Sequence, residues 1–130
     1  MILTVYSRFS CVQCDSTYRA LDSNGINFRI VFVETDESAT GALKELGYLS
    51  APVVKLSEEM IELLFDGLDA EQRKAHPLEE HWSGFRPDQI SKLAEMLAKK
   101  GVSLAPRDIK QGDQQRRQLK ERAQMALLAA

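Results

Sequence analysis

The 130-residue chain is poor in cysteine and tryptophan, with two cysteines and one tryptophan. Two cysteines exclude the multi-disulfide scaffolds on which small secreted domains rely. The sequence also lacks an apolar run long enough to span a bilayer, and its first residues lack the pattern of a signal peptide. The net charge is −2, whereas a nucleic-acid-binding surface needs an excess of basic residues. We therefore expect a cytoplasmic protein that binds neither membranes nor nucleic acids.

The two cysteines form a CxxC motif, Cys11-Val12-Gln13-Cys14, near the N-terminus. A short apolar run, Ile2–Tyr6, precedes the motif and predicts a buried strand. Ser10 followed by Gln13 matches a capping box, so we predict a helix with Ser10 as its N-cap. The thiols then lie one turn apart at the mouth of a helix and at a sheet edge. This context favours reversible redox chemistry.

The position of each thiol predicts its role, because a thiol attacks a disulfide only as the thiolate. As the first helical residue, Cys11 would face unpaired N–H groups and the positive end of the helix dipole. Arg8 would add positive potential. These effects lower the expected pKa of Cys11 from ~8.5 to roughly 5–7. We predict that Cys11 is the attacking nucleophile and that Cys14, further inside the helix, resolves the mixed disulfide.

Two other interpretations of the cysteine pair stay open. The thiols could be buried and inert, or they could bind zinc with His76 and His81 as further ligands. Both histidines lie far downstream in the sequence, and each is more typical of a solvated or hydrogen-bonded surface residue. We therefore favour the redox interpretation.

Hydrophobic periodicity and turn signals predict the element order β-α-β-α-β-β-α, with a parallel first strand pair. The strand at Ile2–Tyr6 is followed by a helix to about Asn24. The later elements are a strand at 26–33, a helix from Asp36 through Leu46, a strand from Pro52, a short strand near 82–85, and a helix from Pro87 closed by Gly101. Such an order gives a four-stranded mixed sheet flanked by helices.

Two segments stand outside this pattern. Residues 57–80 hold 8 acidic and 2 basic side chains and have helical apolar spacing in their first half. Residues 103–130 hold 6 basic and 3 acidic side chains; we expect a linker at 103–112 and a helix at 113–129. Because their charges are opposite, we predict that the two segments pack on one another.

Two further stretches carry candidate binding residues. The Ala51-Pro52 bond could be trans or cis, and a cis bond before Val53 would expose backbone groups that an extended substrate could pair with. In the second stretch, His81–Asp88, Trp82 and Phe85 are typical of either core or site residues. Gly84 there suits a turn closed to other residues. Arg86 is expected to be exposed and available to a partner's carboxylate.

Several stretches together resemble the NrdH-redoxins, glutaredoxin-like proteins of the thioredoxin fold. They are Ile2–Tyr6, Cys11–Cys14, Arg19–Asp22 with Gly25-Ile26, Leu46–Tyr48 with Ala51–Val54, and His81–Asp88. The resemblance covers residues 1–56 and 81–100. It implies an α/β domain of thioredoxin/glutaredoxin fold at 1–102, with 57–80 as a family-atypical insertion. A basic linker and helical tail follow at 103–130.

The resemblance also implies a function. Such a protein is a dithiol–disulfide oxidoreductase that takes electrons from NADPH through thioredoxin reductase. It passes them to the disulfide of the class Ib ribonucleotide reductase large subunit. No bound cofactor or metal is expected besides the redox-active Cys11–Cys14 disulfide, and we expect a monomer. Pro52 should be the cis proline of the fold. The expected partner-binding residues are Arg8, Phe9, Val12, Gln13, Ala51, Pro52, Val53, Trp82, Ser83, Gly84, Phe85 and Arg86.

The sequence departs from the family at Phe9, where members usually have proline, and in the two extra segments. Three other functions stay open. Ser83-Gly84-Phe85 stands where glutathione-dependent glutaredoxins have a glycine-glycine-acid run, which argues against that class. A redox-sensing regulator resembling the Spx and arsenate-reductase family would carry CxxC at nearly the same place. A structural adaptor acting through the tail is the remaining alternative.

Overall fold

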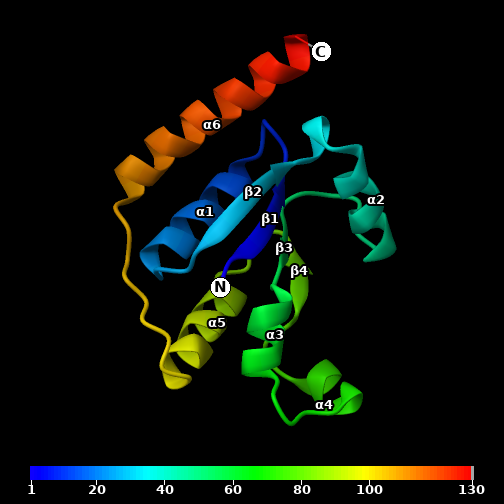
Figure 1. The fold of residues 1–130 in the computed structure, drawn as a ribbon, viewed down its shortest axis with the longest axis vertical. Coiled ribbons are helices and arrows are strands. Elements are labelled where there is room, and N and C mark those ends of the chain that lie inside the picture. The colour runs from blue at the N-terminus through cyan, green and yellow to red at the C-terminus, as the bar shows by residue number, and fades with distance from the viewer. Residues whose placement is uncertain (130) are drawn as a thin grey trace.

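A four-stranded mixed sheet with the order β2-β1-β3-β4 forms the centre of the computed structural model, which describes residues 1–129 (Figure 1). The strands are β1 (Leu3–Ser7), β2 (Phe28–Phe32), β3 (Val53–Lys55) and β4 (His81–Ser83). β1 pairs in parallel with β2 and antiparallel with β3, and β3 pairs antiparallel with β4. The predicted four-stranded mixed sheet and its parallel first pair are confirmed.

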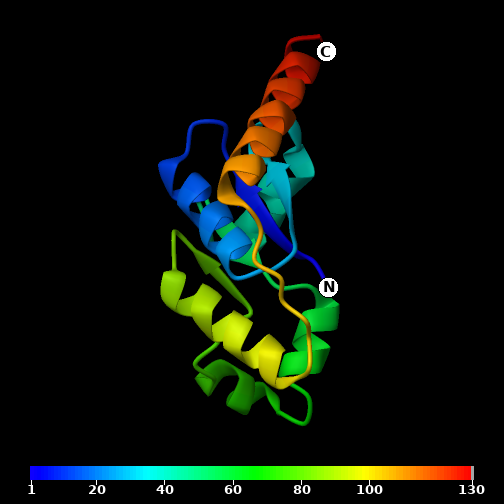
Figure 2. The same ribbon diagram turned by 90° about the vertical axis from the view of Figure 1, so that its left-hand side faces the viewer.

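Helices cover both sides of this sheet. They are α1 (Val12–Ser23), the 3₁₀ turn η1 (Val33–Thr35), α2 (Glu37–Glu45), α3 (Glu58–Leu64), α4 (Ala70–Ala75), α5 (Pro87–Lys99) and α6 (Ile109–Ala129). α1 and α5 lie on one side of the sheet, and α2 lies on the other (Figures 1 and 2).

The predicted helix ends follow from local chemistry. Asp36 is the N-cap of α2, and its carboxylate accepts the N–H groups of Ser38 and Ala39. Pro87 opens α5, where its missing N–H costs nothing. Gly25 follows α1 with a φ of 68°, a left-handed conformation that favours glycine.

The main core lies between the sheet and the α1–α5 layer. The alternation of β1 buries Leu3 and Val5 on one face. Opposite them, the helical spacing of α5 buries Ile90, Leu93 and Leu97. Cys14 also belongs to this cluster, which ties the start of α1 to the core.

The acidic segment 57–80 is part of the same core. Its first half forms α3, as predicted, with Ser57 accepting the N–H of Met60 as N-cap. Met60, Leu64 and Phe65 are buried in the main cluster together with Leu78. The second half adds α4, which the sequence pattern did not predict. Burial of the apolar face of α3 makes this connection between β3 and β4 a structural layer of the domain.

The basic segment packs elsewhere. Its helix α6 begins at Ile109, so the linker is shorter than predicted, and it contacts α1. It lies at the opposite end of the molecule from α3 and α4 (Figure 1). The predicted packing of the two segments on one another is therefore wrong. Among residues 1–129, no helix has both the length and the apolar character needed to cross a bilayer.

Candidate redox site

Cys11 and Cys14 form a disulfide at the start of α1, with their Cα atoms 5.2 Å apart. Cys11 has extended backbone (φ −155°, ψ 99°) and is itself the N-cap, because its Sγ accepts the N–H of Cys14 at 3.1 Å. The predicted capping box, with Ser10 as N-cap and Cys11 as first helical residue, is wrong. The chain stays extended one residue further than expected, so the helix begins at Val12 and sulfur replaces the hydroxyl oxygen of an ordinary cap.

The two sulfur-bearing residues differ in exposure. Cys14 is 1% exposed within the core, whereas Cys11 is half-buried. A sulfur atom of another molecule can therefore approach Cys11 more readily than Cys14. The backbone N–H at Cys11 Sγ and the helix N-terminus beyond it favour negative charge on this sulfur once the disulfide is opened.

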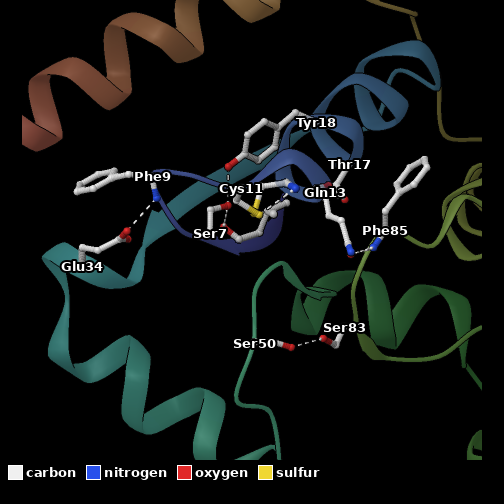
Figure 3. Close-up of a disulfide and its surroundings, with 12 residues drawn as sticks. Ser7, Phe9, Cys11, Gln13, Thr17, Tyr18, Glu34, Ser50, Ser83 and Phe85 are labelled. Carbon is white, nitrogen blue, oxygen red and sulfur yellow. Dashed lines mark hydrogen bonds between the residues drawn. A yellow bond between two sulfur atoms is a disulfide. The ribbon is translucent and has the colours of Figure 1, made fainter.

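The structure brings two distant loops to the cysteine motif (Figure 3). The side-chain oxygen of Gln13 accepts the N–H of Phe85 at 3.2 Å. The N–H of Gly84 donates to the carbonyl of Pro52 at 2.8 Å. These bonds join the start of α1, the loop before β3 and the loop after β4 into one surface.

The loop conformations agree with two expectations. The Ala51–Pro52 peptide bond is cis. Gly84 has a φ of 83°, which side chains rarely adopt, and a Cβ there would meet the Gln13 side chain at 3.3 Å. Pro52 and Val53 are buried, while Ala51 is half-buried.

Arg86 does not present a free guanidinium as predicted. It lies 3.1 Å from Glu79 and 2.8 Å from Asp88. The hydrogen bond from Arg86 lowers the pKa of Asp88, and the same bond raises the pKa of Arg86. Its donors are occupied within the chain, so recognition of a partner's carboxylate would first have to break these pairs.

Phe9 lies on the opposite side of the disulfide from Phe85 (Figure 3). Its ring packs on Phe32 with the centroids 5.0 Å apart, and its N–H donates to Glu34 at 2.9 Å. No sequence signal pointed to Glu34, because the residue types of a strand and turn do not identify a long-range partner. Arg8 next to it is exposed and makes no ion pair within residues 1–129.

Exposed apolar side chains surround the cysteine motif. Val12 is 81% exposed, Leu49 84% and Phe85 38%. Trp82, in contrast, is 1% exposed and belongs to the core. Sequence reasoning missed Leu49, although an apolar residue in the loop before Ala51-Pro52 was the signal available.

Beneath the site, Tyr18 connects α1 to the end of β1. Its hydroxyl donates to Ser7 Oγ at 2.5 Å, and both residues are buried. Burial raises the pKa of Tyr18 to about 12, although the hydrogen bond to Ser7 acts in the other direction. The phenol therefore stays protonated at neutral pH and holds the loop that carries the cysteines.

The two histidines make hydrogen bonds away from the cysteines. His81 Nδ1 lies 2.8 Å from the Tyr48 hydroxyl, and His76 Nδ1 accepts the N–H of Leu78 at 3.0 Å. Within residues 1–129, no three His, Cys, Asp or Glu side chains form a group able to hold a metal ion.

Known proteins resemble this chain in sequence and in fold. The sequence model of the glutaredoxin family matches residues 3–61. The glutaredoxin-like protein NrdH of Salmonella typhimurium is 33% identical over 93 residues, which are 72% of this chain and 89% of that one. NrdH of Escherichia coli K12 is 32% identical over the same shares. The solved structure of Escherichia coli NrdH-redoxin matches with a TM-score of 0.52 and 33% identity, over 72% of this chain and 95% of that chain.

A cysteine pair at the head of α1 in a glutaredoxin-like sheet defines a thiol–disulfide oxidoreductase. More specifically, the chain belongs to the NrdH family of glutaredoxin-like proteins.

Proposed function

We propose that this chain carries electrons from NADPH, through thioredoxin reductase, to the disulfide of the class Ib ribonucleotide reductase large subunit in the cytoplasm. The observation that carries the proposal is the half-buried Cys11 bonded to a buried Cys14 at the start of α1. The NrdH-redoxin of Escherichia coli is described as having a thioredoxin-like activity profile. That description supports thioredoxin reductase as the electron source.

The reaction is a pair of thiol–disulfide exchanges. In the reduced chain, the Cys11 thiolate attacks one sulfur of the partner's disulfide, and the other partner sulfur leaves as a thiolate that takes up a proton. Cys14 then loses its proton and attacks Cys11 Sγ. The partner's second sulfur leaves as a thiol, and the Cys11–Cys14 disulfide forms. Two electrons pass to the partner, and thioredoxin reductase restores the dithiol.

The geometry supports this division of roles. Only Cys11 has partial exposure and an N–H at its sulfur, so it suits both the attack and the departure as a thiolate. Cys14 is covered until the mixed disulfide has formed, which limits competing reactions of the second thiol.

The expected partner-binding residues divide into two groups by role. Val12, Phe85 and Ala51 offer side chains or backbone to a docked partner, together with Arg8 and Phe9 on the other side. We propose that the remaining members hold the loops in place: Pro52, Val53 and Trp82 are buried, Ser83, Gly84 and Arg86 are half-buried, and Gln13 is exposed but bound to the N–H of Phe85.

Two coupled assays test the electron source. The protein is mixed with a disulfide substrate and either NADPH with thioredoxin reductase or NADPH with glutathione and glutathione reductase. We expect turnover in the first system and little in the second. Equal or faster turnover with glutathione would overturn the proposed electron source.

Cysteine variants test the roles. Cys11→Ser should abolish turnover, and Cys14→Ser should accumulate a mixed disulfide whose mass identifies the partner. Ser10→Ala is the matched control, because Ser10 neither caps the helix nor takes part in the exchange. A Cys11→Ser variant that retains activity would contradict the assignment.

A further inference from the structure

The C-terminal part of α6 forms an apolar groove with Phe9. The groove has a volume of about 580 Å³, and its lining residues are Phe9, Glu121, Gln124, Met125, Leu127 and Leu128. Met125 is 67% exposed, Leu127 46% and Leu128 83%. Contiguous apolar side chains left open to water in this way are typical of an interaction site.

Contacts within the domain hold Phe9 and the first part of the helix that forms the groove. On the helix side, Asp22 of α1 binds Arg107 at 3.1 Å and Arg116 at 2.6 Å, which anchors the front half of α6. On the other side, Phe32 and Glu34 hold Phe9 by ring packing and a hydrogen bond. Figure 3 shows α6 passing over Phe9 beside the disulfide. These contacts place the end of α6 next to Phe9.

The groove borders the redox site, because Phe9 in its wall precedes Cys11 by two residues and lies to one side of the disulfide (Figure 3). A partner must bring its own sulfur to Cys11, so the residues that flank this sulfur extend over the surface around the motif. On one side they meet Val12, Leu49 and Phe85, and on the other they meet Phe9.

We propose that the groove between Phe9 and the end of α6 binds apolar side chains of the partner segment that flanks the partner's reactive cysteine. The proposal rests on thiol–disulfide exchange with a protein partner. A second copy of the chain is the less suitable occupant, since it would cover Phe9 and crowd the sulfur that the reaction needs. α6 would thus select substrates by the side chains next to their disulfide.

A single-turnover measurement tests the groove without any reductase. The full chain is first reduced with dithiothreitol. After the dithiothreitol has been removed, the chain is mixed with synthetic peptides that contain a CxxC disulfide. One peptide carries leucine and phenylalanine on both sides of the cysteines, and the second carries serine and glycine there. In each reaction, the peptide disulfide becomes a dithiol and the chain's dithiol becomes the Cys11–Cys14 disulfide.

We expect the apolar peptide to react about tenfold faster than the polar one, because burial of even one leucine-sized side chain supplies this factor. In Met125→Gln/Leu128→Gln the ratio of the two rate constants should fall several-fold, and only the part supplied by Val12, Leu49 and Phe85 should remain. Glutamine is a good helix former, so α6 should persist. Leu119→Gln is the matched control: Leu119 is 42% exposed on the same helix but lines a different cavity, with Ile2 and Phe28.

Three results of the rate measurements would overturn the proposal. They are equal rates for the two peptides with the unaltered chain, a ratio that survives in Met125→Gln/Leu128→Gln, and a ratio lost equally in Leu119→Gln. Sedimentation that shows a dimer abolished by Met125→Gln/Leu128→Gln would also overturn it, by assigning the groove to a second copy. Failure of the unaltered chain to reduce either peptide would instead contradict the proposed function.

Discussion

The acidic segment 57–80 and the basic segment 103–130 are attached to the domain in different ways. α3 places Met60, Leu64 and Phe65 in the main core, so the acidic segment is held by apolar burial. α6 has no buried residue and is held by ion pairs between Asp22 and the arginines Arg107 and Arg116. The opposite net charges of the two segments therefore did not make them pack on one another. Apolar spacing decided the position of α3, whereas ion pairs with Asp22 and Arg19 of α1 decided that of α6.

The largest effect should come from removing apolar burial in the acidic segment. Phe65 is 0% exposed, so Phe65→Ala leaves a cavity and should lower the free energy of unfolding by about 3–5 kcal/mol. Urea denaturation followed by circular dichroism measures this change. Glu62→Ala on the exposed face of α3 is the control and should change the value by less than about 0.5 kcal/mol. A small loss in Phe65→Ala would mean that the segment is a loosely attached insertion.

A smaller and more local effect should follow from Asp22→Asn. The side chain of Asp22 is 3% exposed and that of Arg116 13%, so the substitution removes a well-shielded charge from two guanidinium partners. Docking of α6 should weaken by about 2 kcal/mol, within the range for hydrogen bonds to charged groups. Hydrogen exchange should accelerate in 109–129 while the sheet stays protected. The exposed Asp15→Asn on the same helix should leave exchange in α6 unchanged.

The smallest effect concerns pH at Asp113. Burial by itself raises the pKa of Asp113, but hydrogen bonds from Arg19 and Arg116 outweigh it and lower the pKa below its ordinary value of 3.8. A lowered folded pKa means that the stabilisation is present above pH 3.8 and is lost as the pH falls through the folded value. Because the Arg19–Asp113 pair is partly exposed, the loss of stabilisation should stay below about 1 kcal/mol.

Hydrogen exchange in α6, measured over this acidic range, checks the effect at Asp113. Asp113→Asn should remove the pH dependence that belongs to α6, although Asp36 and Asp88 titrate below their ordinary values in other helices. Unchanged pH dependence in Asp113→Asn would mean that another group controls docking. Together with the two larger effects, this measurement separates apolar from ionic attachment.

Much of the fold could be predicted because its signals are local. Asp36 caps the next helix through its own carboxylate, Pro87 opens α5, and Gly25 ends α1 with a positive φ. Each depends on neighbours within one helical turn. The N-cap of α1 was placed one residue too early, at Ser10, because the backbone at Cys11 is extended and the Cys11 sulfur itself accepts the first N–H bond.

The candidate site was predictable only in part, because only some of its contacts join residues that are close in the sequence. The spacing of Cys11 and Cys14 is local, and so is their position at a helix start. Arg86, in contrast, was expected to be exposed and available to a partner, and its pairing with Glu79 appears only once the loop before β4 has folded beside it. The packing of separate segments brings Leu49 and Glu34 close to the site, and no periodicity in the sequence predicts this position.

The sequence by itself determined the redox pair, the strand that precedes it and the order of the sheet elements, because these depend on residue type, spacing and alternation within short windows. The tertiary structure alone decided what surrounds the pair. It joined Gln13 to Phe85 and Pro52 to Gly84, and it placed the end of α6 over Phe9. Such contacts join residues far apart in the chain, and one acidic residue can pair with any of several basic ones. Only the packed fold selects among them, as it did when Asp22 bound Arg107 and Arg116.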